Sequence, residues 1–180
     1  MNIQHSSRTD LWYTPGNILI AARTVLGPIG FDPASDVFGN QRVMATTYYD
    51  EGDDGLTRPW PKDITVWVNP PGSKVGNKSK TGLFWGRLMQ HRAEGKLKHA
   101  MFMCFSVEAL QSTQNKVWPA IGEFPLCVPA KRIRFIGPDG LPGMAPSHSN
   151  AIVYVTGTVD VTPKFKRVFS SLGTVLNVSG

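Results

Sequence analysis

Apolar positions near the start of the chain follow helical spacing. From Ile18 to Leu26 they recur three or four residues apart, which predicts an amphipathic helix. Thr14 is expected to cap this helix, because its hydroxyl can accept from an N–H group of the first turn. Pro15 is expected at the first helical position, where its missing N–H costs nothing. Gly27 is expected to end the helix.

The stretch with the strongest β character runs from Ile64 to Val68. It consists of β-branched and aromatic residues, which predicts a buried strand. Asn69-Pro70-Pro71 follows directly, and two prolines cannot continue a central strand because they donate no ladder hydrogen bond. Asn69 is therefore expected at the carboxyl edge of a sheet, where ligands bind in open α/β folds.

The remaining pattern predicts alternating strands and helices. A short strand that leads into a turn is expected over 29–35, and further strands over 98–107, 124–128, 151–156 and 173–178. An extended segment is expected over 42–49 and an edge strand over 130–135. Helices are expected over 83–95, 108–118 and 163–172, and polar loops over 72–82 and 137–150. This alternation predicts an α/β fold with a mostly parallel sheet. We expect one domain over residues 10–180, preceded by a flexible N-terminus over 1–9.

The 180-residue chain is basic, with a formal net charge of +6, and a basic small domain suits a polyanionic partner such as nucleic acid. The charge is uneven, because an acidic cluster over 50–54 precedes the central strand and lysines follow it. A solvated loop is the alternative for the lysines. The candidates for phosphate contacts are Lys74, Lys78, Lys80, Lys131, Arg132 and Arg134.

Several classes of protein are not favoured. The first residues lack the apolar core of a signal peptide, and no apolar run reaches membrane-spanning length, so we expect a cytoplasmic protein. Cys104 and Cys127 each lie in an apolar run, which predicts buried free thiols. The four histidines are scattered and no metal-ligand spacing occurs, so no metal is expected.

Asn69 and Pro70 carry the most specific chemistry. The asparagine amide oxygen and the proline carbonyl oxygen can each accept a hydrogen bond. Together they could hold one planar amino group and make its nitrogen lone pair more available, as methyl transfer to an exocyclic amine or an amide nitrogen requires. The alternative is a strand followed by a proline-rich turn.

Two carboxylates also have two interpretations. Asp32 would lie at the carboxyl end of a strand, where it could bind a cofactor or simply form an Asx-turn. Asp54 could accept a hydrogen bond from a cofactor's adenine amine or ribose, or belong to a solvated acidic loop.

Four short segments occur in order along the chain: Trp12-Tyr13-Thr14-Pro15, Phe31-Asp32-Pro33-Ala34-Ser35, Asp53-Asp54-Gly55-Leu56 and Val66-Trp67-Val68-Asn69-Pro70-Pro71. Together they resemble the phage-type DNA adenine-N6 methyltransferases, which use S-adenosylmethionine. The similarity continues over residues 124–129, Arg132-Ile133 and Val153-Tyr154. It therefore covers most of the chain, from about residue 10 to residue 175.

The resemblance implies a class I, Rossmann-like methyltransferase fold, with a mostly parallel sheet flanked by helices and an antiparallel hairpin at its C-terminal end. It implies that Asn69, Pro70 and Pro71 hold the target adenine amine of DNA. The residues that it implies for the S-adenosylmethionine site are Trp12, Tyr13, Thr14, Pro15, Asp32, Pro33 and Asp54. The target base would have to be flipped out of the duplex or supplied single-stranded.

The chain departs from the family pattern in two places. Family members usually carry an aromatic residue directly after the two prolines, where it stacks on the extruded base, and here that position is Gly72. Phe84, Trp85 or another aromatic residue would then have to supply the stacking. The segment after Asp32 also lacks the Gly-x-Gly continuation of many methyltransferases.

Two other functions are compatible with the same residues. Asn-Pro-Pro followed by an aromatic residue also occurs in enzymes that methylate guanine amines in RNA or glutamine amides in proteins. A non-catalytic nucleic-acid-binding protein on a methyltransferase scaffold is the second alternative, and Gly72 is the observation that motivates it.

Overall fold

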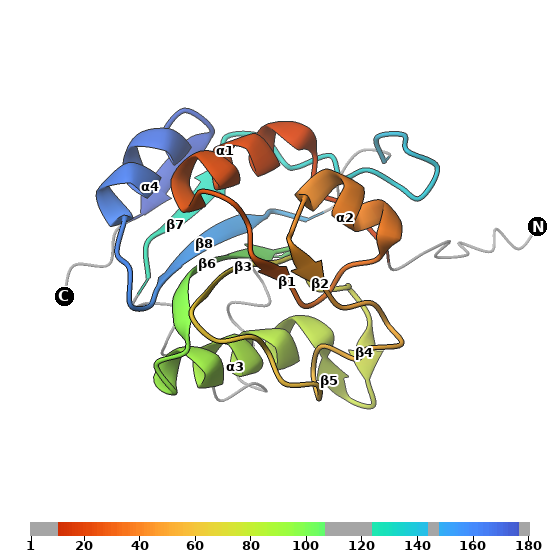
Figure 1. Ribbon diagram of the computed structural model, residues 1–180. Coiled ribbons are helices and arrows are strands. Elements are labelled where there is room, and N and C mark those ends of the chain that lie inside the picture. Colours follow the sequence, from red (N-terminus) through yellow and green to blue (C-terminus); the bar gives the residue numbers. More distant parts are fainter. Residues whose placement is uncertain (1–10, 107–123, 144–147, 177–180) are drawn as a thin grey trace, which may run out of the picture.

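The longest apolar runs of the chain form the middle of a seven-stranded sheet in the computed structural model (Figure 1). The structure describes residues 11–106, 124–143 and 148–176. The sheet order is β2-β1-β3-β6-β8-β7-β9. Its strands are β1 (Phe31–Asp32), β2 (Thr47–Tyr48), β3 (Ile64–Val68), β6 (Leu97–Cys104), β7 (Leu126–Pro129), β8 (Ala151–Thr156) and β9 (Gly173–Leu176). A separate antiparallel hairpin pairs β4 (Lys74–Val75) with β5 (Lys78–Ser79).

The sheet is mixed. β2, β1, β3 and β6 pair in parallel, whereas β8 runs antiparallel to both of its neighbours, β6 and β7, and β9 runs antiparallel to β7. β7 therefore points the same way as β6, and only β8 and β9 are reversed. The expectation of an α/β fold with a mostly parallel sheet is confirmed, and the reversed strands come from the C-terminal part of the chain.

Helices cover both faces of the sheet (Figure 1). The helices are α1 (Gly16–Leu26), α2 (Val37–Val43), α3 (Lys80–Ala93) and α4 (Thr162–Phe169). α1, α2 and α4 lie on one face, and α3 lies on the other. Alternate strand residues point to opposite faces, so Trp67 packs in the core beneath α1 while Val66 and Val68 pack in the core against α3.

The first helix differs from expectation at its start. α1 begins at Gly16, and its N-cap is Pro15 with no side-chain cap bond, so Thr14 is not the cap. The end agrees with the prediction: Gly27 has a φ of 77°, and its N–H donates to the carbonyl of Arg23.

Helix α2 was not predicted from the sequence. The extended segment predicted over 42–49 is wrong at residues 42 and 43, which belong to this helix. Asp36 caps this helix by accepting from the Gly39 N–H at 2.6 Å. At its other end, the Arg23 guanidinium of α1 donates to the carbonyls of Arg42 and Val43. A short segment with glycine and asparagine thus becomes helical through its cap and a tertiary contact.

Two other segments differ from the predictions. The loop expected over 72–82 contains the β4–β5 hairpin and the first turn of α3. The edge strand expected over 130–135 is absent, because the Ile133 N–H donates to the Asn150 side chain and not to a neighbouring strand. The helix predicted over 108–118 lies outside the described residues.

Cys104 and Cys127 are buried and free, as predicted. Burial raises the pKa of the Cys104 thiol to about 12 and that of Cys127 to about 11, so both are protonated at neutral pH.

Candidate active site

The order of the first strands creates a crevice at their carboxyl ends. β1 lies between β2 and β3 in the sheet. The chain therefore moves from β1 to β2 on one side and then crosses back to β3 on the other side of β1. After β1 it enters α2 on one face of the sheet, and after β3 it enters the hairpin and α3 on the other face (Figure 1). Diverging connections of this kind leave a ligand-binding space at a topological switch point.

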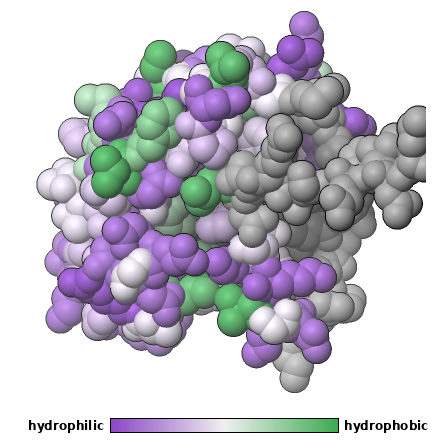
Figure 2. Space-filling view, turned by 90° about the vertical axis from the view of Figure 1, so that its right-hand side faces the viewer, coloured by the Kyte–Doolittle hydropathy of each residue, from purple (hydrophilic) through white to green (hydrophobic). Residues whose placement is uncertain are grey.

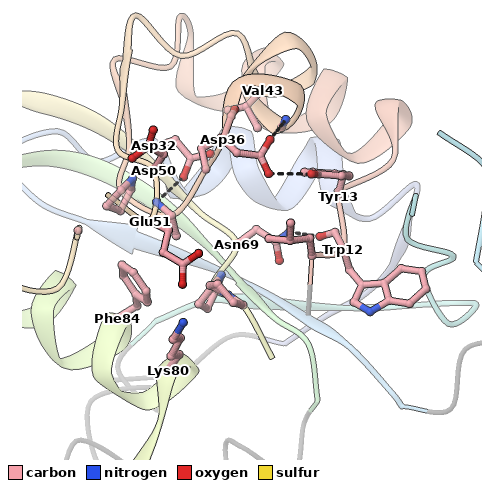
Figure 3. A pocket seen from close by; sticks show the side chains of 18 of the residues that line it. Trp12, Tyr13, Asp32, Asp36, Val43, Asp50, Glu51, Asn69, Lys80 and Phe84 are labelled. Atoms are coloured by element: carbon pink, nitrogen blue, oxygen red, sulfur yellow. Dashed lines mark hydrogen bonds between the residues drawn. The ribbon is translucent and has the colours of Figure 1, made fainter. Parts of the chain in front are cut away.

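A cavity of about 480 Å³ occupies this position. It is bordered by residues 11–14, by the turn after β1, by the acidic loop after β2 and by the corner after β3. Most of the residues proposed from the sequence for the cofactor and the target amine line it: Trp12, Tyr13, Thr14, Asp32, Pro33, Asp54, Asn69, Pro70 and Pro71. Figure 3 shows Asn69 in the middle of these side chains, with Asp32 and Asp50 on one side of it and Trp12 on the other.

The side chain of Asn69 is oriented by the backbone. Its Nδ2 group donates to the carbonyl oxygen of Trp12 at 2.8 Å (Figure 3). A carbonyl oxygen only accepts, so this bond determines which end of the amide faces Trp12. The Oδ1 atom of Asn69 has no hydrogen-bond donor among the described residues and is available to accept one.

Asp32 is buried at the end of β1, with 2% of its surface exposed. Its Oδ1 atom accepts from the Ala34 N–H at 3.0 Å, so the Asx-turn considered from the sequence is present. Burial raises the pKa of this carboxyl to about 7, although the bonds to Ala34 and Ser35 oppose the shift. The same residue thus forms the turn and lines the cavity.

The cavity is acidic although the protein is basic. Its lining includes the carboxyl groups of Asp32, Asp36, Asp50, Glu51 and Asp54, against the cations of Arg42 and Lys80. Asp36 accepts from the Tyr13 hydroxyl at 2.7 Å, and burial together with this bond raises the Tyr13 pKa well above its usual range. The site therefore favours a ligand that carries positive charge and hydroxyl groups.

The acidic loop over 50–56 is fixed against the turn after β1. Trp60 is buried and donates from Nε1 to the Gly55 carbonyl at 2.7 Å. A Cβ atom on Gly55 would come within 1.9 Å of the Pro33 carbonyl oxygen, so only glycine allows this approach. Asp54 is engaged within the loop, where it accepts from the Leu56 N–H and the Thr57 hydroxyl.

Two buried polar atoms belong to residues of the lining and lack partners among the described residues. They are the hydroxyl oxygen of Thr14 and the indole nitrogen of Trp67. Buried polar groups are normally paired, so these two are candidates for contacts with a bound ligand or water.

The remaining predicted residues lie outside the cavity, apart from Lys80 and Phe84, which line it from α3. Pro15 precedes α1 and is half-buried. Lys74 and Lys78 are exposed on the β4–β5 hairpin. The three basic residues of the segment that follows β7 are also exposed: Lys131, Arg132 and Arg134. Figure 2 shows that hydrophilic residues dominate the face on which α2 and the hairpin lie, with only small separate hydrophobic patches.

Sequence reasoning did not single out several residues of the lining, among them Asp36, Asp50, Glu51 and Phe105. The position of Asp50 directly after an expected extended segment was a usable signal, because carboxyl ends of parallel strands meet at one edge. The strand predicted over 98–107 included Phe105, whereas β6 ends at Cys104. No local signal therefore distinguished Phe105 from the core residues of this strand.

Neither a metal nor a membrane site is evident in the described ranges. No three His, Cys, Asp or Glu side chains gather there in a way that could hold a metal ion. Within the same ranges, no helix has the length and apolar character needed to cross a bilayer.

Comparison with known proteins identifies the family of this chain. A search of curated proteins and a search of solved structures gave no match. The family model described as DNA N-6-adenine-methyltransferase (Dam) matches residues 2–142, a range that contains every segment bordering the cavity. The chain that brings Asn69, Asp32 and Trp12 to one crevice therefore belongs to the DNA N-6-adenine-methyltransferase family.

Proposed function

We propose that this protein transfers a methyl group from S-adenosylmethionine to the N6 atom of adenine in DNA. The observation that carries the proposal is the orientation of Asn69, whose Nδ2 atom is bound to the Trp12 carbonyl and whose Oδ1 atom is left to accept from an amino group. Membership of the family supports DNA adenine as the target. The strand order, with a reversed strand between β6 and β7, supports a class I, Rossmann-like methyltransferase fold.

The residues of the cavity fit S-adenosylmethionine. This molecule carries a sulfonium and an ammonium group against one carboxylate, so its net positive charge suits the acidic lining. Asp50 and Glu51 follow β2, and an acidic residue in such a position commonly accepts from ribose hydroxyls. The unpartnered Thr14 hydroxyl would contribute a further polar contact. When bound, S-adenosylmethionine supplies a methyl group activated by the positive charge on sulfur.

The protein would contribute alignment of the amine. Asn69 Oδ1 and the Pro70 carbonyl would each accept a hydrogen bond from one N–H group of adenine N6. These two bonds would fix the plane of the amino group and therefore the direction of its nitrogen lone pair. The Trp12 bond keeps the asparagine from rotating, so this alignment does not have to be created when the base arrives. N6 becomes acidic once it is methylated, so water can take its proton and no strong base is required.

DNA would approach at the carboxyl edge of the sheet. Adenine N6 cannot be attacked inside a duplex, so the base would be flipped into the cavity or supplied single-stranded. Lys74 and Lys78 on the hairpin, with Lys80 at the start of α3, are proposed to contact phosphates close to the cavity. Lys131, Arg132 and Arg134 are proposed to do the same on the segment after β7.

The decisive experiment is sequencing of DNA from cells that express the protein, with detection of N6-methyladenine. The parent protein is expected to methylate adenine at a defined sequence, and Asn69→Ala to leave the same DNA unmethylated. In parallel, purified protein is incubated with isotope-labelled S-adenosylmethionine and DNA, RNA or protein. Label in RNA or protein alone would contradict the proposal, and so would tight DNA binding with no label in any substrate.

A further inference from the structure

The position that usually carries the stacking ring is open in this protein. Gly72 is exposed, and a Cβ atom built on it would have no neighbouring atom within 4 Å. It lines the cavity directly after Pro71 but offers no side chain. A flipped base held by Asn69 and Pro70 would therefore lack an aromatic contact from this corner.

The aromatic residues suggested by the sequence do not fill this role equally. Trp85 is buried between Phe102 and Phe124, with ring centroids at 5.1 and 6.0 Å, and it does not line the cavity. Phe84 does line the cavity, but it is only 5% exposed and belongs to the core beneath α3. That core also includes Val68 of β3 and Leu56 of the acidic loop, so the Phe84 side chain is enclosed by packing between α3 and the sheet.

Phe105 lies near the amine-binding corner in the topology of the sheet. It follows β6, the strand that pairs in parallel with β3, and Phe102 is the register partner of Val68. Asn69 and Phe105 therefore emerge from the carboxyl ends of adjacent strands. Phe105 and Trp12 also pack against the same core beneath α1, on the side to which Asn69 is bound.

The ring of Phe105 is held in place by aromatic neighbours, although the residue is only partly buried. Phe135 contacts it with centroids 5.2 Å apart, and His148 contacts it at 5.5 Å. The Asn150 side chain, which also accepts from the Ile133 N–H, donates to the Phe105 carbonyl. Phe105 is half-buried and lines the cavity, as a ring that offers a face to a ligand must.

We propose that Phe105 is the base-stacking residue of this protein and takes the role that Gly72 cannot fill. The proposal rests on the proposed function, since it names the residue that holds the flipped adenine at the same site. Stacking of a base on an aromatic ring is not specific for sequence and helps to keep the base out of the duplex. The ring thus stabilises the extruded base while Asn69 orients its amine.

The test uses the full chain and a duplex that contains the site identified by sequencing. Methylation rates are compared for the parent, Phe105→Leu, Gly72→Tyr and the double variant, with Phe84→Leu and Phe84→Leu/Gly72→Tyr as the matched control pair. A second readout is the emission of 2-aminopurine in place of the target adenine, which rises when the base leaves the duplex and is quenched when it stacks on a ring. Thermal unfolding of each variant reports whether the fold is retained.

Phe105→Leu is expected to lower kcat/KM roughly 10-fold or more, because stacking of one base on an aromatic ring usually contributes that much. It is also expected to weaken the quenching of the 2-aminopurine emission. In the Phe105→Leu background, Gly72→Tyr is expected to restore most of kcat/KM and most of the quenching, because the new ring has open space. In the Phe84→Leu background, the same substitution is expected to restore neither. If Phe105 had only a structural role, Gly72→Tyr would not restore the methylation rate of Phe105→Leu. The absence of this rescue would therefore overturn the inference. So would an unchanged rate for Phe105→Leu, or rescue of Phe84→Leu instead. If the parent methylates no DNA, the proposed function fails first.

Discussion

The side-chain amide of Asn69 donates a hydrogen bond of 2.8 Å to the backbone carbonyl of Trp12, although the two residues are 57 positions apart. The bond joins the corner after β3 to the segment before α1, and both segments line the cavity. Because the acceptor belongs to the backbone, the Trp12 side chain is not needed for it. Asn69 is thereby held with one polar atom engaged and the other free.

Replacement of Asn69 is expected to remove methylation and leave cofactor binding largely intact. Asn69→Ala deletes an acceptor that is already oriented, and loss of one such group lowers kcat by roughly 10²-fold or more. Asn69→Asp should be as inactive, because a carboxylate cannot donate to the Trp12 carbonyl and would turn away from it. Methylation rates and calorimetric binding of S-adenosylmethionine measure the two effects. Asn17→Ala is the control, since this exposed asparagine of α1 lies outside the cavity, and more than half of the parent rate is expected.

Gly55→Ala is expected to disturb the cavity by contact with the backbone. The new Cβ atom would lie 1.9 Å from the Pro33 carbonyl oxygen, so the acidic loop or the turn after β1 must move. We expect a decrease of about 1–3 kcal/mol in the free energy of unfolding and weaker binding of S-adenosylmethionine. Urea denaturation and calorimetry check this. In Gly16→Ala the added Cβ atom meets nothing within 4 Å, and equal destabilisation by both substitutions would contradict the explanation.

Asp32 should make stability depend on pH in a defined direction. Burial raises its pKa to about 7, so between about pH 4 and pH 7 the folded protein keeps a proton that the unfolded chain has lost. The contribution of this group to the free energy of unfolding therefore falls as pH rises through that interval. Asp32→Asn should remove this part of the slope. Urea unfolding of both proteins across the interval measures it, and identical slopes would show that Asp32 is not the group responsible.

A positively charged ligand should also release the proton of Asp32. Such a ligand favours the carboxylate, so binding of S-adenosylmethionine is expected to tighten as pH rises toward 7 and to release protons below it. Calorimetry in buffers with different ionisation enthalpies detects the release. Asp32→Asn is expected to bind more weakly and with less proton release.

The lysines of the hairpin should affect the salt dependence of DNA binding. Lys74 and Lys78 are exposed on β4 and β5, next to the corner that carries Asn69. If each contacts a phosphate, replacement by alanine should reduce the slope of log K against log salt concentration by roughly 1 per lysine. Fluorescence anisotropy at several salt concentrations gives the slope. Lys62→Ala is the control, because this exposed lysine precedes β3 at its amino end.

Local residue chemistry was sufficient wherever neighbours in the sequence decide the conformation. Ile64–Val68 and Ala151–Thr156 form strands with the predicted bounds, because their side chains suit a strand buried on both faces. Gly27 ends α1 because the chain there requires a positive φ. Residues 130–135 show the limit of this reasoning. Their basic and apolar side chains do alternate between solvent and core, but the Asn150 side chain, and not a neighbouring strand, binds the Ile133 N–H.

The sequence by itself determined the central strands, the end of α1 and the corner at Asn69, because β-branched residues, glycine and prolines act on their own stretch of backbone. Only the tertiary structure decided what the corner can do. The free end of the Asn69 amide depends on Trp12, the pKa of Asp32 depends on its burial, and the access of Phe105 to the cavity depends on two adjacent strands. Each of these properties arises from groups far apart in the chain, so no local pattern could specify it.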